Sequence, residues 1–182
     1  MTPPKIAYQN TRKNLQAMRD AELLDDLALA WELFLIYHHR TWNKCQAQYE
    51  GKAFWGPLYP KYSARRKQDP LLIYVHQARH VDEHGIQPIA QVQPASTVVT
   101  NGTLTGCTTI TGGEGYVLGY GSTATIKVIP ATVLSNPVTN KGRTYAPPTL
   151  DGSSTPPVLR IAEEAIMFFD DLFADIDAAG GN

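Results

Sequence analysis

The stretch Leu23-Leu-Asp-Asp-Leu-Ala-Leu-Ala-Trp-Glu-Leu-Phe-Leu-Ile-Tyr-His38 decides the fold class. Its large side chains return at spacings of three and four residues, which is the period of an α-helix with one apolar face. The members of this stripe are Leu23, Leu24, Leu27, Trp31, Phe34, Leu35 and His38. Asp20 is a suitable N-cap and Gly51 a suitable stop, so the pattern predicts one helix from about Asp20 to Tyr49.

Three further helices are expected on either side of this stretch. A short helix from about Ile6 to Met18 precedes it. Asp69-Pro70 pairs a capping residue with a proline for the first turn and predicts a helix that Gly85 ends. Thr155-Pro-Pro157 begins a final helix of strong apolar periodicity. Trp55-Gly-Pro-Leu-Tyr-Pro60 predicts a break, because prolines and glycine oppose a helix interior.

The segment before the last helix differs in composition. Residues 86–150 contain only four charged side chains and are rich in Thr, Val and Gly, which favours strands. Asn101-Gly102 is typical of a hairpin turn between flanking strands. Further strands are expected at Cys107–Thr111, Tyr116–Tyr120 and Thr123–Ile129. The Pro- and Ser-rich stretch from Asn136 to Pro157 predicts an extended linker.

These elements together predict an α+β protein. We expect an antiparallel bundle of three or four helices, with a small antiparallel β module inserted before the last helix. Residues 1–86 form the first part of the bundle, residues 87–155 the β-rich module and linker, and residues 156–182 the last helix. A sheet so poor in charge needs cover over its edges, which predicts a homodimer or higher homo-oligomer.

The sequence predicts a cytoplasmic protein without a membrane span. The longest apolar region, Leu27 to Tyr37, is interrupted by Glu32 and is far shorter than the ~20 residues that a span needs. The first residues contain no apolar signal segment. The two cysteines, Cys45 and Cys107, are expected as reduced thiols, although a disulfide between them remains an alternative.

Charge is unevenly distributed along the chain. The net charge is −1, but residues 1–67 contain 11 Lys and Arg against 6 Asp and Glu. A nucleic-acid surface would therefore lie in this half. The candidate residues are Lys61, Arg65, Arg66 and Lys67. The alternative is a basic face that packs against the acidic last helix.

The segment Arg79-His80-Val81-Asp82-Glu83-His84-Gly85 ends the third predicted helix. Arg79 and His84 are close enough on a helix to point in nearby directions. Histidine works as an acid or base near neutral pH, and arginine stabilises phosphate charge. These two residues predict cleavage of RNA without a metal: histidine activates the 2′-hydroxyl and arginine stabilises the phosphorane.

At these residues the chain resembles the HEPN superfamily. The motif of that superfamily is an arginine, a polar residue and, a few residues later, a histidine; Arg79, His80 and His84 match it, and Gly85 matches the residue that often follows. The resemblance implies a helical bundle and a metal-independent endoribonuclease that leaves a cyclic phosphate, as in defence or toxin systems. It also implies a dimer with a composite site, in which Arg79 and His84 are catalytic and His80 orients them.

Three other interpretations remain open for the same residues. Arg79 pairs with Glu83 at i,i+4, in a purely structural role. His76, His80 and His84 lie on one helical face and, with His38 from the first long helix, bind zinc or another divalent metal. The third alternative is a non-enzymatic oligomeric protein, for example of phage type, in which the histidines have no chemical role.

Overall fold

The computed structural model describes residues 2–85, 87–100 and 125–181, and the side chains of 97–100 and 125–128 are left aside. Within these residues the chain divides into two units. The helical unit consists of Met1–Gln91 and Val133–Asn182, and the second unit consists of Val92–Thr132. Every residue of the candidate site described below lies in the helical unit.

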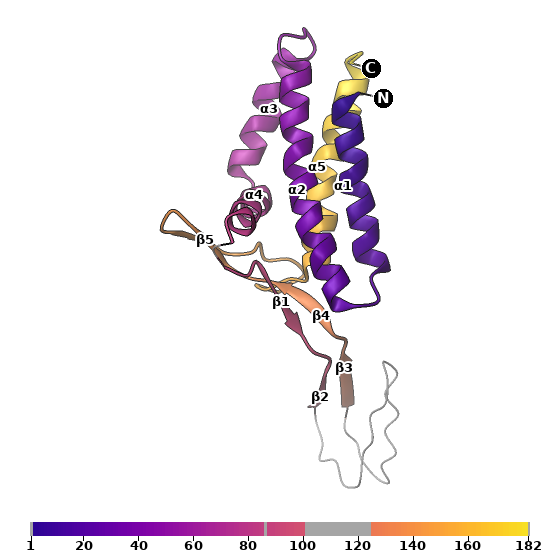
Figure 1. Ribbon diagram of the computed structural model, residues 1–182, viewed down its shortest axis with the longest axis vertical. Coiled ribbons are helices and arrows are strands. Elements are labelled where there is room, and N and C mark those ends of the chain that lie inside the picture. The colour runs from indigo at the N-terminus through magenta and orange to yellow at the C-terminus, as the bar shows by residue number, and fades with distance from the viewer. Residues whose placement is uncertain (1, 86, 101–124, 182) are drawn as a thin grey trace. The chain divides into compact units, whose positions relative to one another are not determined.

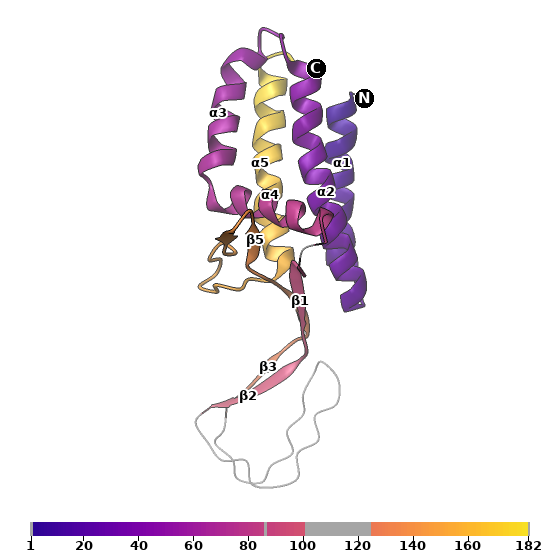
Figure 2. The same cartoon turned by 60° about the vertical axis from the view of Figure 1, so that its left-hand side comes forward.

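Five helices form the helical unit. These are α1 (Pro3–Asp20), α2 (Leu24–Tyr49), α3 (Trp55–Gln68), α4 (Pro70–Glu83) and α5 (Val158–Ala178). Four of them, α1, α2, α3 and α5, run lengthwise beside one another, and α4 lies across them (Figures 1 and 2). The predicted α+β class with a helical bundle is confirmed.

The start of α2 and the whole of α3 differ from the expectation. Asp20 ends α1, and Leu23 stands at the N-cap position of α2. Trp55 to Pro60, predicted as a break, begins α3. Pro57 lies in the first turn, where the backbone N–H has no acceptor within the helix, so it costs little there. Pro60 removes one helical hydrogen bond, which the packing of the buried Trp55 and Tyr62 offsets.

The ends of α4 follow the predicted chemistry. The Asp69 side chain accepts a hydrogen bond of 2.9 Å from the backbone N–H of Leu71, and Pro70 occupies the first helical position. Gly85 follows the helix with φ of +58°, a left-handed conformation that glycine adopts without steric clash because it has no Cβ. The motif is therefore held at a well-defined helix end.

The core of the helical unit surrounds α5. Ten residues of α5 are buried, and Phe168 and Phe169 are almost completely inaccessible to solvent. Around α5 the buried side chains of α2 and α4, such as Trp31, Phe34 and Val75, form one continuous cluster. α4 contacts α2, α3 and α5, and Val81 in its last turn is completely buried in the core cluster, so this turn is fixed against the bundle.

All six described strands lie between α4 and α5 in the chain, as predicted. They are β1 (Ala90–Gln93), β2 (Ser96–Thr100), β3 (Thr125–Ile129), β4 (Thr132–Ser135), β5 (Val138–Asn140) and β6 (Arg143–Tyr145). β1 pairs with β4, while β2–β3 and β5–β6 are antiparallel pairs. The predicted strand at Thr123–Ile129 corresponds to β3. The Asn101-Gly102 turn, the strands expected at 107–111 and 116–120, and Cys107 lie outside the described residues.

The predicted extended linker contains a hairpin instead. β5 and β6 are joined by Lys141 and Gly142, both with positive φ, as a two-residue turn of type I′ requires. This hairpin packs against α4, and the Asn140 amide donates a hydrogen bond of 2.8 Å to the Gln77 side-chain oxygen. None of the helices described here is long and apolar enough to cross a bilayer.

Candidate functional site

Arg79 is held by a two-point ion pair at the end of α4. Its Nη1 lies 2.6 Å from Glu83 Oε2, and its Nη2 donates a hydrogen bond of 2.7 Å to Oε1. The Arg79 side chain is 18% exposed, so its guanidinium is positioned but still reaches the surface. The i,i+4 pair that the sequence left open is thus present, and it fixes the orientation of the guanidinium.

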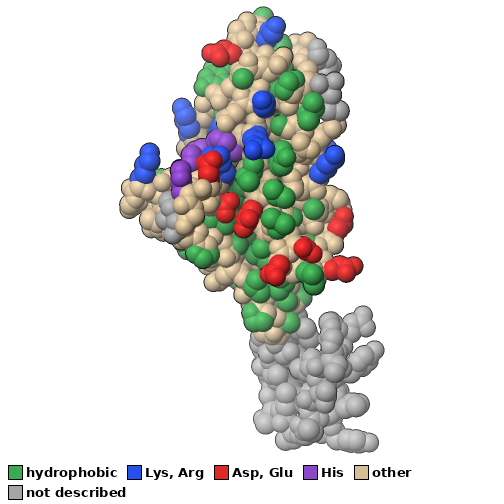
Figure 3. Space-filling view, viewed as in Figure 1, with side chains coloured by type: hydrophobic (Ala, Val, Ile, Leu, Met, Phe, Trp, Pro, Cys, Tyr) green, Lys and Arg blue, Asp and Glu red, His purple; other side chains and the backbone are tan. Residues whose placement is uncertain are grey.

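Glu83 also connects Arg79 to the two histidines of the motif. One ligand atom each from His80, Glu83 and His84 lie within 4.8 Å of one another. His84 is exposed and caps the C-terminus of α4, while His80 is half-buried. An arginine, a carboxylate and two imidazoles therefore meet at one solvent-facing helix end, next to the Lys and Arg side chains that Figure 3 shows beside the histidines.

His80 packs with two further imidazoles, those of His39 and His76, between α2 and α4. Ring centroids lie 4.6 Å apart for His76 and His80, 5.4 Å for His39 and His76, and 6.1 Å for His39 and His80. Burial, and then the nearby Arg79, lower the pKa of His39 to about 4; burial, and then Arg66, lower that of His76 to about 4. Burial also lowers the pKa of His80, with Arg79 as the next cause. At neutral pH all three imidazoles are therefore uncharged.

His38 lies on the opposite side of α2. Its Nε2 is 3.4 Å from the carbonyl oxygen of Ala165 in α5, and its ring packs against Phe34 and Phe169. Burial lowers its pKa to about 3. His38 is consequently a core residue. Within the part of the chain that the structure describes, the predicted metal set His76, His80, His84 and His38 is not assembled; the group of ligand atoms comprises His80, Glu83 and His84.

The four basic residues predicted to bind nucleic acid fall into two pairs. Lys61 and Arg65 point toward α5, where Lys61 Nζ lies 2.6 Å from Asp175 and Arg65 Nη1 lies 2.7 Å from Asp171. These two residues form a basic face that packs against the acidic last helix, which was the alternative to a nucleic-acid surface. Arg66 instead stacks over the Trp42 ring, with 4.6 Å from its guanidinium carbon to the ring centroid.

Two hollows meet at Arg66, Lys67 and His76. The larger, of about 310 Å³, also includes Ile73, Gln77, Arg143 and Tyr145. The smaller, of about 220 Å³, includes Trp42, Gln46, Tyr59 and Ser63. Arg143 and Tyr145 belong to the hairpin that replaces the predicted linker, and no local signal in the sequence connects them to α3 or α4.

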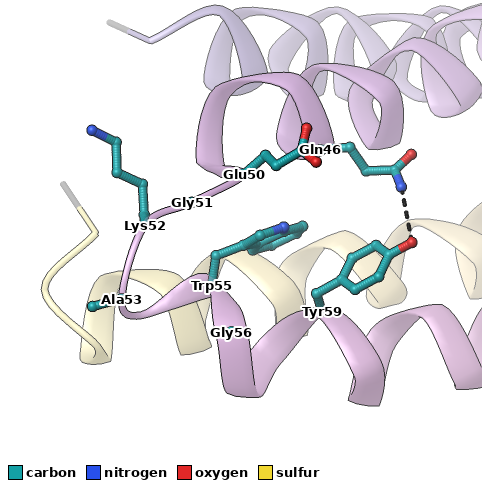
Figure 4. Close-up of a pocket in the computed structure, with 8 residues that line it drawn as sticks. All are labelled: Gln46, Glu50, Gly51, Lys52, Ala53, Trp55, Gly56 and Tyr59. Atoms are coloured by element: carbon teal, nitrogen blue, oxygen red, sulfur yellow. Dashed lines mark hydrogen bonds between the residues drawn. The ribbon is translucent and has the colours of Figure 1, made fainter.

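A third hollow, of about 400 Å³, lies where α2 passes to α3. Trp55 and Tyr59 of α3 face Gln46 of α2 and Glu50 at its C-cap, and the Gln46 amide donates a hydrogen bond of 3.3 Å to the Tyr59 hydroxyl (Figure 4). Gln46 and Tyr59 also line the 220 Å³ hollow, so the three hollows follow one another from the α2–α3 turn to β6. The third one presents both Glu50 and Lys52 and has no dominant charge.

The described cysteine offers no nucleophile. Cys45 is a buried free thiol in the core of the bundle. Burial raises its pKa to about 12, so the reactive thiolate is scarce at neutral pH. The chain matches no family model, no curated protein and no solved structure.

Proposed function

We propose that this chain is a HEPN-like protein that binds and cleaves RNA without a metal, in a defence or toxin system. The observation that carries the proposal is the meeting of Arg79, Glu83 and His84 at one exposed helix end. The helical bundle and the exposure of His84 are consistent with it. Arg79 and His84 act as catalytic residues, and His80 is a positioning residue.

The reaction needs one base and one cation near a phosphodiester. The His84 imidazole accepts the proton of the RNA 2′-hydroxyl, and the 2′-oxygen attacks the adjacent phosphorus. The new O2′–P bond forms as the P–O5′ bond breaks. The 5′-oxygen takes a proton from water, and the resulting hydroxide takes up the proton that His84 had accepted. Arg79 stabilises the charge of the phosphorane with its fork of donors. The products are a 2′,3′-cyclic phosphate and a 5′-hydroxyl.

Glu83 has a definite part in this scheme. In the free protein the Glu83 carboxylate is paired with both Nη atoms of the Arg79 guanidinium. An incoming phosphate competes for the same donors, so Glu83 orients Arg79 before binding and gives way when the phosphate arrives. A second copy of the chain would bring a second motif to the site, and we place this homodimer in the cytoplasm.

The proposal is tested with end-labelled RNA oligonucleotides in buffer with EDTA. Arg79→Ala is expected to slow cleavage about 10²–10³-fold, as for loss of a transition-state donor. His84→Ala is expected to slow it about 10²–10⁴-fold, as for loss of a general base. Arg65→Ala removes an exposed arginine that is paired with Asp171 of α5 and serves as the control. Absence of cleavage by the parent protein across varied RNAs would refute the nuclease.

The group of His80, Glu83 and His84 favours a second candidate function, the binding of zinc or another divalent metal. Two imidazoles and a carboxylate are suitable zinc ligands, and their proximity is the supporting observation. Zinc at 100 times its Kd would stabilise the protein by about 2.7 kcal/mol, raising Tm by roughly 5–10 °C. His84→Ala should abolish that rise. A Tm that responds neither to zinc nor to other divalent metals excludes this function.

A further inference from the structure

Three cations border the hollows next to the motif, and none of them has a carboxylate partner in the part of the chain that the structure describes. Arg66, Lys67 and Arg143 line the 310 Å³ hollow, and within the described residues no Asp or Glu lies at ion-pair distance from any of them. Their neighbours Lys61 and Arg65 on the same helix are both paired with α5. The three cations of this hollow are thus available to bind an external anion.

Arg66 is the cation most clearly arranged for such an anion. Its guanidinium is half-buried against Trp42, and this burial lowers the pKa of Arg66 to about 10. Withdrawing a charge from water without a counter-ion is costly, and a bound phosphate would offset that cost. The contact of the Arg66 guanidinium with the π face of Trp42 offsets only part of this cost.

The walls of the hollows suit unpaired bases. Tyr145 and Ile73 also line the larger hollow, and the Arg143 guanidinium carbon lies 5.2 Å from the centroid of the Tyr145 ring. The Gln77 side-chain oxygen accepts its hydrogen bond from Asn140, which leaves the Gln77 amide N–H groups for a ligand. In the smaller hollow Tyr59 is 38% exposed beside Gln46 and Ser63. Aromatic rings interspersed with cations are typical of grooves that bind single-stranded nucleic acid.

We propose that these two hollows form a binding groove for single-stranded RNA, with phosphates on Arg66, Lys67 and Arg143 and bases against Tyr145 and Tyr59. The groove leads to the motif: His76 lines both hollows, and its ring contacts His80, which is grouped with Glu83 and His84. A duplex keeps its bases stacked inside and cannot insert them beside tyrosines, so the groove selects unpaired RNA. This inference deepens the proposed function and rests on it.

Two matched double variants test the groove, both in a His84→Ala background that prevents cleavage. Lys67→Ala with Arg143→Ala removes two exposed cations of the groove. Lys61→Ala with Arg65→Ala removes the same charge, but from residues of α3 that are paired with α5. The probe is a fluorescently labelled single-stranded RNA of mixed sequence, and its Kd is measured by anisotropy between 0.05 and 0.5 M salt.

The groove variant is expected to bind about 25-fold more weakly at 0.1 M salt, because each cation on a single-strand phosphate contributes a salt exponent of about 0.7. Its salt slope should fall by about 1.4, because two phosphates no longer meet a cation. The paired-residue variant should stay within about twofold of the parent. Tyr145→Leu should weaken binding about tenfold, and Tyr145→Phe should retain it, because a ring is what stacks. Duplex RNA should bind more weakly than the single strand.

The outcomes separate the groove from the nuclease. Equal losses in the two double variants, or none in the groove variant, overturn the groove. Cleavage by the protein with His84 intact is measured in parallel. RNA binding with the expected pattern but no cleavage supports the groove and refutes the nuclease. Cleavage that the Lys67 and Arg143 substitutions leave unchanged supports the nuclease and overturns the groove.

Discussion

Acidification from pH 8 to pH 5 is expected to lower the free energy of unfolding by about 4 kcal/mol, through three buried or half-buried histidines. His38 contributes most. Its pKa is about 3 in the folded protein against 6.5 ordinarily. At pH 5, roughly 1.5 pH units below that ordinary value, the unfolded side chain gains about 2 kcal/mol from protonation that the folded one does not.

His39 and His76 add smaller contributions of the same sign. Each has a folded pKa of about 4. Both rings are partly exposed, so solvent screening reduces the contribution of each to about 1 kcal/mol. Because the folded pKa values are lowered, the unfolded state binds more protons between pH 6.5 and pH 4. Stability is complete above pH 6.5 and falls as the pH decreases through this window. Burial raises the pKa of Glu32 and of Asp82, which offsets part of the loss.

Urea unfolding at pH 8, 7, 6 and 5, followed by far-UV circular dichroism, measures this dependence. His38→Leu removes the deepest imidazole, and its ring neighbours Phe34 and Phe169 are apolar. The variant should lose about 2 kcal/mol between pH 8 and pH 5 instead of about 4, whatever its stability at pH 8. If the parent protein and His38→Leu lose equal stability over this range, the attribution to a buried neutral His38 is refuted.

Three shorter predictions concern stability and the thiol. Asp69→Ala removes the hydrogen bond to the Leu71 N–H and should lower stability by about 1 kcal/mol, measured by thermal unfolding. Phe169→Ala should cost about 3–5 kcal/mol. Met167→Ala, at a side chain that is 52% exposed, should cost under about 1 kcal/mol by the same measurement; equal losses would contradict the assigned core. Cys45 should resist a thiol reagent until the protein unfolds.

The helices with strong local signals were predictable from sequence. α5 has an apolar face along its whole length, and α4 has Asp69, Pro70 and Gly85 at its ends, so periodicity and capping identify both. α3 was not predictable in this way, because its first six residues include a glycine and two prolines. Its formation depends on contacts that are distant in sequence: Trp55 packs on Trp42 and Tyr49, and Tyr62 packs on Phe168.

In the candidate site, too, some residues are predictable from local sequence and others depend on packing. Arg79, Glu83 and His84 share two turns of one helix, so their spacing is enough to bring them together. Whether Arg66 and Lys67 face α5 or the histidines depends on the packing of α3 against its neighbours. The approach of Arg143 depends on a hairpin with a Lys-Gly turn. His39 could not be preferred over His38 without knowing which side of α2 faces α4.

The place of α5 in the chain has a consequence for how the protein is made. α5 supplies much of the core, and its carboxylates pair with Lys5, Arg19, Lys61 and Arg65 of the helices that precede it. On the ribosome, α1 to α4 emerge well before α5 does. Their apolar faces remain exposed, or are shielded by chaperones, until the final helix is translated. A nascent chain stalled before residue 158 would therefore expose the apolar faces of an incomplete, aggregation-prone bundle.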